Sequence, residues 1–217
     1  MDRDAYGAAL LNAPMIEEDA HFLRELARDA LRIIEVGTFS GIATEIMLAA
    51  QPEGGELITI DTFEGTPGTA TAFAASGATL ARAKARLARF GSRVKIIKGE
   101  SLAVARKIEN GSADLVFLDA GHAYQSVRAD ILAWLPKVKP TGLIAGHDYD
   151  KAALSSSKWW LTENKDLDCV VGPNIHCGVT LAVDEAFERV SLAPNFFSSL
   201  WWAKPEWLRG TKREGIE

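Results

Sequence analysis

The stretch "RIIEVGTFSGIATEIM", residues 32–47, decides the fold. Its apolar start, 32–36, is typical of a buried strand, and the residues from 42 to 51 have the composition of a helix. The loop between them contains Gly37 and Gly41, which let a ligand approach the backbone closely. A strand, a glycine loop and a helix in this order indicate a ligand-binding loop at the carboxyl end of a strand.

The same order of strand and helix repeats along the chain. Strands are predicted at 31–36, 56–61, 93–99, 113–120 and 142–149, and helices at 15–30, 42–51, 79–90, 101–110, 124–138 and 178–190. Continuously apolar strands that alternate with helices favour an α/β protein with a Rossmann-like, doubly wound, mostly parallel sheet and helices on both faces.

The 217 residues are expected to form a single domain, 1–217, because a second full domain would be crowded. Its N-terminal segment, 1–30, is expected to be helical. Two short strands are predicted near 190–197 and 198–204. The segment 150–177 is interpreted as an irregular insert at the substrate site, where Trp159 and Trp160 either stack on a ring of the substrate or pin the insert to the core.

Charge and composition exclude several classes of protein. A net charge of −5 argues against a nucleic-acid partner held by phosphate contacts. No apolar run is long enough to span a bilayer, and the acidic N-terminus lacks the pattern of a signal peptide. Cys169 and Cys177 form no CxxC pair, which favours two reduced thiols and a cytoplasmic location.

The glycine loop does not fit a phosphate ligand. It has neither the Gly-Lys-Ser/Thr of a P-loop nor G-x-G-x-x-G, and Glu35 at its mouth would repel a pyrophosphate. A carboxylate there favours a ligand with a cationic part. Asp61 matches the acid that accepts hydrogen bonds from a ribose, and Glu100 lies where an adenine amino group would come. Each acid alone could be a solvated strand end, but the ordered set favours S-adenosylmethionine.

The chain also resembles a known family at these residues. "EVGTFSG" (35–41) is similar to the cofactor loop of catechol- and caffeoyl-CoA-type O-methyltransferases, which are class I S-adenosylmethionine-dependent enzymes. "FLDAGHAYQSVRADILAWLPKVKPTGLIAGHDY" (117–149) resembles a bacterial branch with D-x-x-H-x-Y and, later, H-D-Y. The resemblance implies a seven-stranded sheet with an antiparallel strand in its last pair. Thr141 stands where the family usually has a glycine, which concerns only a turn.

The resemblance also implies the roles of individual residues in cofactor binding. They are Glu35, Gly37 and Gly41 around the methionine part, Thr38, Phe39 and Ser40 along the loop, Asp61 and Thr62 at the ribose, Gly99, Glu100 and Ser101 at the adenine, and Asp119 near the methionine amine or the reacting centre. Residues that bind the acceptor do not carry over, because 150–177 does not align with the family. The expected acceptor is small or carrier-linked: a sugar, a natural product or a phenol.

Methyl transfer to oxygen requires an alcohol or phenol to lose a proton. His122 and His147 follow two neighbouring strands and are expected to face one crevice, and an imidazole with a pKa of about 6.5 suits a general base. His122 is the first choice as the base, with Asp119 beside it. The alternatives, a helix cap for His122 and a structural hydrogen bond for His147, remain open.

A divalent metal is a further open question. Asp119, His147 and Asp148 stand where catechol-type enzymes hold Mg²⁺, but Mg²⁺ prefers oxygen ligands, so the histidine also leaves Mn²⁺ or no metal as alternatives. The tryptophans near the C-terminus either form a homodimer surface or complete the sheet edge. The alternative functions are an NAD(P)-dependent oxidoreductase and a catalytically silent, S-adenosylmethionine-binding partner subunit.

Overall fold

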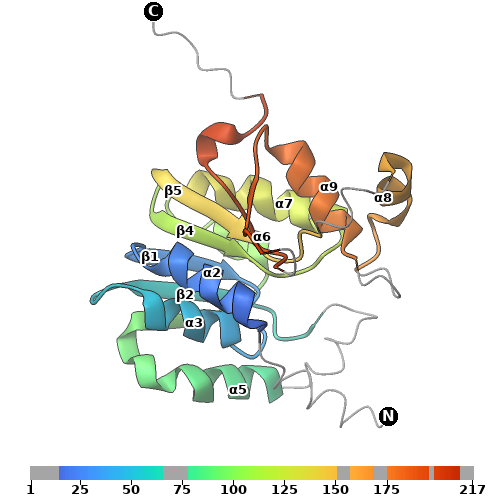
Figure 1. Ribbon diagram of the computed structural model, residues 1–217. Coiled ribbons are helices and arrows are strands. Elements are labelled where there is room, and N and C mark those ends of the chain that lie inside the picture. Colours follow the sequence, from blue (N-terminus) through green and yellow to red (C-terminus); the bar gives the residue numbers. More distant parts are fainter. Residues whose placement is uncertain (1–14, 66–77, 151–156, 169–174, 196–197, 211–217) are drawn as a thin grey trace, which may run out of the picture.

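The computed structural model describes residues 15–65, 78–150, 157–168, 175–195 and 198–210. Seven strands form one sheet in the order β3-β2-β1-β4-β5-β7-β6 (Figure 1). They are β1 (Arg32–Val36), β2 (Glu56–Asp61), β3 (Val94–Lys98), β4 (Ala113–Leu118), β5 (Val138–Gly146), β6 (Ser191–Leu192) and β7 (Trp201–Ala203). Strands β1 to β5 are parallel, and β7 runs antiparallel to both β5 and β6. The predicted seven-stranded, mostly parallel sheet is confirmed.

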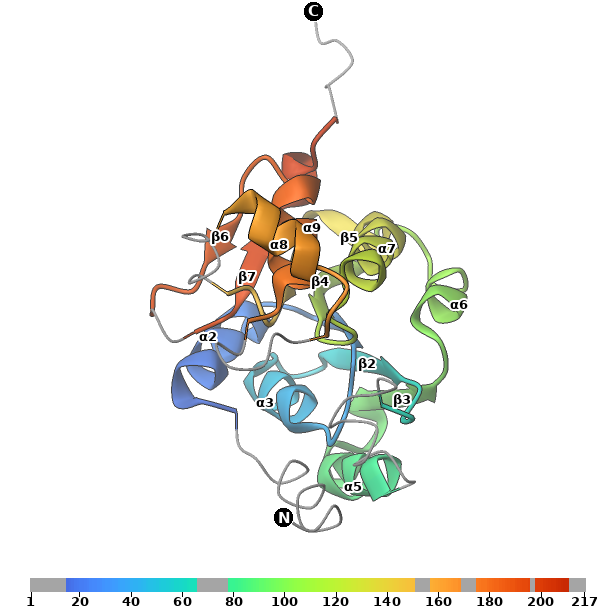
Figure 2. The same ribbon diagram turned by 90° about the vertical axis from the view of Figure 1, so that its right-hand side faces the viewer.

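Helices cover both faces of the sheet (Figures 1 and 2). They are α2 (Glu17–Ala27), α3 (Ile42–Ala50), α5 (Ala78–Leu87), α6 (Ser101–Ala105), α7 (Tyr124–Trp134), α8 (Lys158–Asn164) and α9 (Cys177–Ala186), with short 3-10 turns η1 (Ala88–Arg93), η2 (Leu135–Lys137) and η4 (Pro205–Trp207). Successive side chains of a strand point to opposite faces. Ile33 accordingly packs with α2, α3 and α5, and Ile34 packs with α6, α7 and α9.

The order of the strands also positions a crevice. The chain moves outward from β1 through β2 to β3 and then returns to place β4 on the other side of β1. The loops after β1 and β4 therefore diverge at the carboxyl edge of the sheet, which is where open α/β sheets bind ligands.

Several predicted elements differ in extent from the structure. Helix α6 ends at Ala105 and not at 110, and strand β6 covers only Ser191–Leu192. Strand β5 begins at Val138 and not at 142, because Val138 pairs with Ala113 before a shift in register, and the preceding helix α7 already ends at Trp134. The insert 150–177 is not wholly irregular, since it contains α8, which begins where the Ser157 side chain accepts a hydrogen bond from the backbone of Trp160. Residues 151–156 and 169–174 of the insert, which include Cys169, and residues 66–77 of the loop lie outside the described residues.

The tryptophans near the C-terminus complete the sheet. Trp201 is fully buried in β7, and the ring of Trp202 packs on that of Trp207 with centroids 5.4 Å apart. The homodimer and the single domain stay predictions. Within the described ranges, no helix has the length and apolar character needed to cross a membrane.

Candidate active site at the carboxyl ends of the strands

A cavity of about 1160 Å³ opens at the carboxyl edge of the sheet. This volume is large enough for a nucleoside-containing cofactor together with a small acceptor. Its wall contains most of the residues that the sequence singles out: Gly37, Thr38, Phe39, Ser40, Asp61, Thr62, Gly99, Glu100, Ser101, Asp119, His122, His147 and Asp148. Glu35 and Gly41 do not line it.

The glycine loop passes directly over the end of β4. Gly37 has φ +97°, and a Cβ at this position would lie 1.8 Å from the carbonyl oxygen of Asp119. No side chain fits there, so Gly37 is what allows the loop after β1 to contact β4. Gly41, with φ +81°, begins α3 from a left-handed conformation that glycine adopts without strain.

Asp61 holds this loop in place. Its Oδ2 accepts hydrogen bonds from the backbone N–H groups of Thr38 (2.9 Å) and Phe39 (2.7 Å), and its Oδ1 accepts one from Phe63 (2.7 Å). Phe39 and Phe63 have positive φ angles, which persist only where the surroundings enforce them. A carboxylate offers about four acceptor positions. Asp61 therefore still has room for a ribose hydroxyl at Oδ1.

Arg86 on α5 supports the same loop from outside the cavity. Its Nε donates to the carbonyl oxygen of Ser40 (3.0 Å), and its Nη1 to Oε2 of Glu45 on α3 (2.9 Å). Glu45 also pairs with Arg89 at 2.9 Å. Arg86 therefore links the glycine loop to α3 and α5, and Arg89 adds a second contact to Glu45.

Glu35 corrects the sequence interpretation. Its side chain is fully buried beneath the loop, where Oε2 accepts hydrogen bonds from the hydroxyls of Thr44 and Thr59, both at 2.5 Å. Burial raises the pKa of Glu35, the two hydroxyls lower it, and the nearby charges of Asp119 and Asp61 add a smaller increase. The net result is a pKa of about 8. At pH 7 this group carries a proton and does not line the cavity. It therefore does not present a carboxylate to a cationic ligand.

The end of the cavity beyond Asp61 is formed where α6 begins. Glu100 is exposed at the cavity wall, and the Ser101 hydroxyl donates to Oδ1 of Asp130 (2.5 Å) while it accepts from Nε1 of Trp134 (2.8 Å). Burial raises the pKa of Asp130 to about 6. The hydroxyl of Ser101 is thus held by α7, and Glu100 is the free side-chain acceptor at this end.

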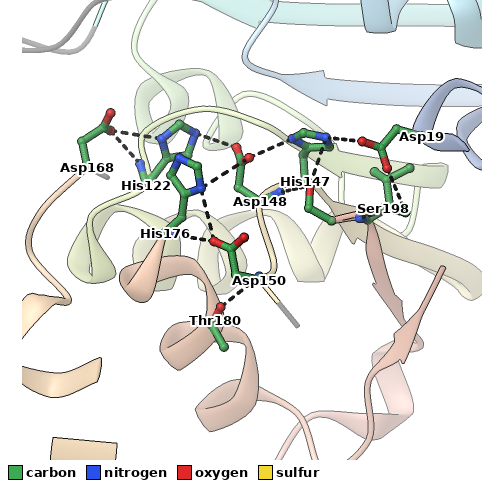
Figure 3. A network of polar contacts seen from close by, with 11 residues as sticks. Asp19, His122, His147, Asp148, Asp150, Asp168, His176, Thr180 and Ser198 are labelled. Atoms are coloured by element: carbon green, nitrogen blue, oxygen red, sulfur yellow. Dashed lines mark hydrogen bonds and ion pairs between the residues drawn. The ribbon is translucent and has the colours of Figure 1, made fainter. Parts of the chain in front are cut away.

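The opposite end of the cavity is a network of alternating imidazoles and carboxylates (Figure 3). Asp148, which has φ +61°, lies between two histidines: its Oδ2 is 3.0 Å from Nε2 of His122, and its Oδ1 is 3.0 Å from Nδ1 of His147. The outer nitrogens of the two rings face further carboxylates, with His122 Nδ1 3.2 Å from Asp168 and His147 Nε2 3.0 Å from Asp19.

A third histidine completes the network. His176, just before α9, has its Nδ1 3.4 Å from Oδ2 of Asp150 and 3.6 Å from Oδ1 of Asp148. Sequence reasoning assigned no role to His176, and it missed Asp19 and Asp168, because none of the three follows a strand. Their residue types were the only signal, and acids and histidines are common on surfaces.

The network fixes the charge of its members. Burial opposes a charged imidazole, but Asp148 acts against it at both histidines. With Asp168 it raises the pKa of His122 well above the usual value, and with Asp19 it does the same for His147. Burial likewise opposes a charged Asp148, but the two histidines hold its pKa well below the usual range. The network therefore favours the protonated form of both imidazoles.

The residues predicted to bind a metal do come together. One ligand atom each from Asp119, His147 and Asp148 lie within 4.8 Å of one another. His147 is backed by the carboxylate of Asp19, as metal-binding histidines usually are. Two carboxylates and one imidazole suit Mn²⁺ at least as well as Mg²⁺. The donor set therefore fits a divalent cation.

Several solved structures share this fold. An O-methyltransferase from Bacillus cereus in complex with S-adenosylhomocysteine has a TM-score of 0.62 and 19% identity over 93% of this chain and 87% of that one. The O-methyltransferase TomG from Streptomyces achromogenes, solved with S-adenosylmethionine, has a TM-score of 0.59 and 18% identity over 94% and 98%. A Staphylococcus aureus protein provisionally assigned as a caffeoyl-CoA O-methyltransferase has a TM-score of 0.60 and 15% identity over 93% and 90%.

No curated protein sequence matches the chain significantly. Residues 34–149, more than half of the chain, match the family model described as a methyltransferase domain. That range starts in β1, includes the glycine loop and Asp61, and ends with the His147–Asp148 pair of the network. The chain therefore belongs to the methyltransferase domain family.

Proposed function

We propose that the protein is an S-adenosylmethionine-dependent methyltransferase that methylates an oxygen of a small or carrier-linked acceptor, such as a sugar, a natural product or a phenol. One observation carries the proposal: a single cavity has a glycine loop held by Asp61 at one end and paired histidines and aspartates at the other. The first end, where Asp61 and Glu100 supply hydrogen-bond acceptors, suits a nucleoside, and the second suits a hydroxyl that must lose a proton.

The cofactor half would bind through groups that already have fixed positions. The free acceptor capacity of Asp61 suits the ribose, Glu100 suits the adenine amine, and the close approach of Gly37 to Asp119 leaves backbone next to the methionine part. When bound, the cofactor supplies a methyl group on a sulfonium leaving group that is already activated. Much of the rate enhancement is therefore positioning, which a rigid loop supports.

The acceptor half would handle the proton. His122 lines the cavity, and its Nε2, in the unprotonated form, is the proposed proton acceptor, while Asp168 on Nδ1 fixes the orientation of the ring. Asp119, His147 and Asp148 would hold a divalent cation, which supplies positive charge that stabilises an alkoxide or phenoxide. We infer a cytoplasmic location from the expected reduced thiols.

Calorimetric titration of the chelator-treated protein with S-adenosylhomocysteine tests the proposal first. Micromolar binding supports it, whereas no binding with or without Mg²⁺ or Mn²⁺ would reject it, and tight NADH binding instead would favour an oxidoreductase. Turnover is then measured on a panel of alcohols, sugars and phenols by the release of S-adenosylhomocysteine.

The base is tested with His122→Ala beside a matched control. His122→Ala should retain S-adenosylhomocysteine binding and lose about 10²–10⁴-fold in turnover. His21→Ala, on the exposed side of α2, should change neither. Cofactor binding with no turnover on any acceptor, and no effect of His122→Ala, would favour a silent partner subunit.

A further inference from the structure

His176 has no part in the proposed reaction, yet it lies in the middle of the network. One ligand atom each from His122, Asp148 and His176 fall within 4.8 Å of one another. The two imidazole rings meet edge to face with centroids 4.6 Å apart, on one side of the Asp148 carboxylate (Figure 3). This cluster contains neither Asp119 nor His147. It is therefore a different set of ligands from Asp119, His147 and Asp148, which offers more oxygen donors.

The fold brings His176 to this place through a close backbone contact. A Cβ at Gly178 would lie 2.3 Å from the carbonyl oxygen of His122 and 2.5 Å from the backbone nitrogen of Tyr124. The first turn of α9 can therefore pack against the loop after β4 only because residue 178 is glycine. His176, two residues earlier, is thereby placed beside His122.

Carboxylates also surround the two imidazoles. His122 directs Nε2 towards Asp148 and has Asp168 behind Nδ1, the arrangement in which an outer carboxylate orients a metal-binding histidine. On His176, the backbone N–H donates to Asp150, whose Oδ2 also lies 3.4 Å from Nδ1. Asp150 is therefore close enough to serve as an additional oxygen ligand.

We propose that His122, His176 and Asp148 form a second divalent-cation site, which prefers a borderline ion such as Zn²⁺ to Mg²⁺. Two imidazole nitrogens and one carboxylate oxygen are typical ligands of Zn²⁺ and Co²⁺, whereas Mg²⁺ selects oxygen donors. The set of Asp119, His147 and Asp148 has the opposite balance, with one nitrogen and two carboxylates. The two sites share Asp148, so they are coupled.

The second site has a consequence that rests on the proposed function. An ion bound to Nε2 of His122 takes the lone pair that would accept the proton of the acceptor. Zn²⁺ therefore inhibits methyl transfer, and it does so even when the first site holds Mg²⁺ or Mn²⁺. Removal of His176 relieves the inhibition without removing the base.

Cobalt is the probe that distinguishes the two sites. The full-length, chelator-treated protein is titrated with Co²⁺ while visible absorption is recorded, and the intense bands of a four- or five-coordinate, nitrogen-ligated ion are expected. His176→Gln should bind Co²⁺ at least tenfold more weakly and lose these bands. The matched control is Asp119→Asn, which removes a ligand of the first site only and should keep the bands and the affinity.

Three outcomes would overturn the second site. They are weak octahedral absorption in the wild type, unchanged Co²⁺ affinity in His176→Gln, and an equal loss in Asp119→Asn. The wild-type spectrum decides the question even if a variant fails to fold, which circular dichroism would reveal. Zn²⁺ inhibition of turnover in the wild type, absent in His176→Gln, supports the consequence. Cobalt binding without turnover on any acceptor would reject the proposed function and leave the site standing.

Discussion

The two halves of the cavity are built on different principles. In the half at β1 and β2, Asp61 accepts hydrogen bonds from backbone N–H groups between residues 38 and 63, and Arg86 donates to a backbone carbonyl of the same loop. In the half at β4 and β5, side chains meet side chains, and they come from segments as distant as α2 and α9. The shape of the half at β1 and β2 therefore depends on backbone geometry, and that of the half at β4 and β5 depends on the pairing of charged side chains.

This difference predicts how each half fails. A change that alters the loop backbone should abolish cofactor binding and reduce stability together, because the loop is also part of the core packing. A change in the histidine network should alter turnover or metal binding and leave cofactor affinity nearly constant. The comparison is therefore testable with pairs of variants.

The largest effect is expected for Gly37→Ala. The new Cβ would overlap the carbonyl of Asp119, and φ +97° is unfavourable for alanine. Overlap and backbone strain together should lower the free energy of unfolding by about 3 kcal/mol, and S-adenosylhomocysteine binding should disappear. Urea unfolding and calorimetry measure the two effects.

Gly111→Ala is the matched control for this substitution. Gly111 also has a positive φ, +63°, but a Cβ there meets nothing within 4 Å. It should cost only about 1–2 kcal/mol of backbone strain and leave cofactor affinity intact. If Gly37→Ala bound S-adenosylhomocysteine as tightly as the wild type, the loop after β1 would be able to move away from β4. The half of the cavity at β1 and β2 would then not be rigid.

Asp61→Asn should weaken S-adenosylhomocysteine binding about 100-fold, which corresponds to about 2.7 kcal/mol. The amide replaces one acceptor oxygen by a donor, so it cannot accept all three backbone hydrogen bonds that hold the loop.

Asp114→Asn is the control. Asp114 also accepts two hydrogen bonds, from Arg32 and Lys139, but at the opposite edge of the sheet. Equal losses of cofactor affinity in both variants would contradict a local role for Asp61.

The two halves also differ in how far the sequence predicts them. The strand-end positions of Asp61, Asp119 and His147 follow from apolar runs, because the end of a buried strand is visible in the pattern. Periodicity does not report which distant side chains meet, so Asp19 and His176 could not be found. The aspartate–histidine pairs depend on packing of α2 and α9 against the sheet, which no local pattern encodes.

Glu35 is a different kind of error, because the information was in the sequence. Side chains alternate along a strand, so Glu35 must lie on the same face as Ile33, which packs under α3. The threonines of "GIATE" and "LITID" then provide buried hydroxyls for it. Whether an acid near the end of a strand lines the cavity therefore depends on the face of the sheet to which its side chain points, and not only on its distance from the end of the strand.

Asp19→Asn tests the half of the cavity at β4 and β5. We expect kcat to decrease about tenfold, because substitution of a residue that orients a metal ligand typically costs at least that much. An amide retains the shape of Asp19 but weakens its interaction with Nε2 of His147. S-adenosylhomocysteine affinity should stay within about twofold of the wild type. Ser198→Ala removes the hydrogen bond to the other oxygen of Asp19, together with one that the hydroxyl accepts from the backbone of Leu200, and should have a smaller effect on kcat. A large loss of cofactor affinity in Asp19→Asn would mean that the two halves are not separable.

The smallest effect, measured per pH unit, concerns Glu35, which is buried beneath the glycine loop. Its pKa is about 8 in the folded protein against 4.5 in an unfolded chain, mainly because of burial. Between these values the folded protein keeps a proton that the unfolded chain has lost. The free energy of unfolding therefore falls as the pH rises through this window, by about 1 kcal/mol per pH unit near its middle.

Glu35→Gln should remove this dependence. Glutamine can accept both threonine hydrogen bonds but does not titrate, so the variant should gain stability relative to the wild type at each step from pH 5.5 to 7.5, as measured by urea unfolding. Parallel curves for the two proteins would contradict a buried, protonated Glu35. The charges of Asp61 and Asp119 raise the pKa of Glu35 by repulsion, so a positive charge nearby should lower it. If the free energy of unfolding of the wild type depended less on pH with bound S-adenosylmethionine, this would indicate that the sulfonium charge acts on Glu35 through the loop.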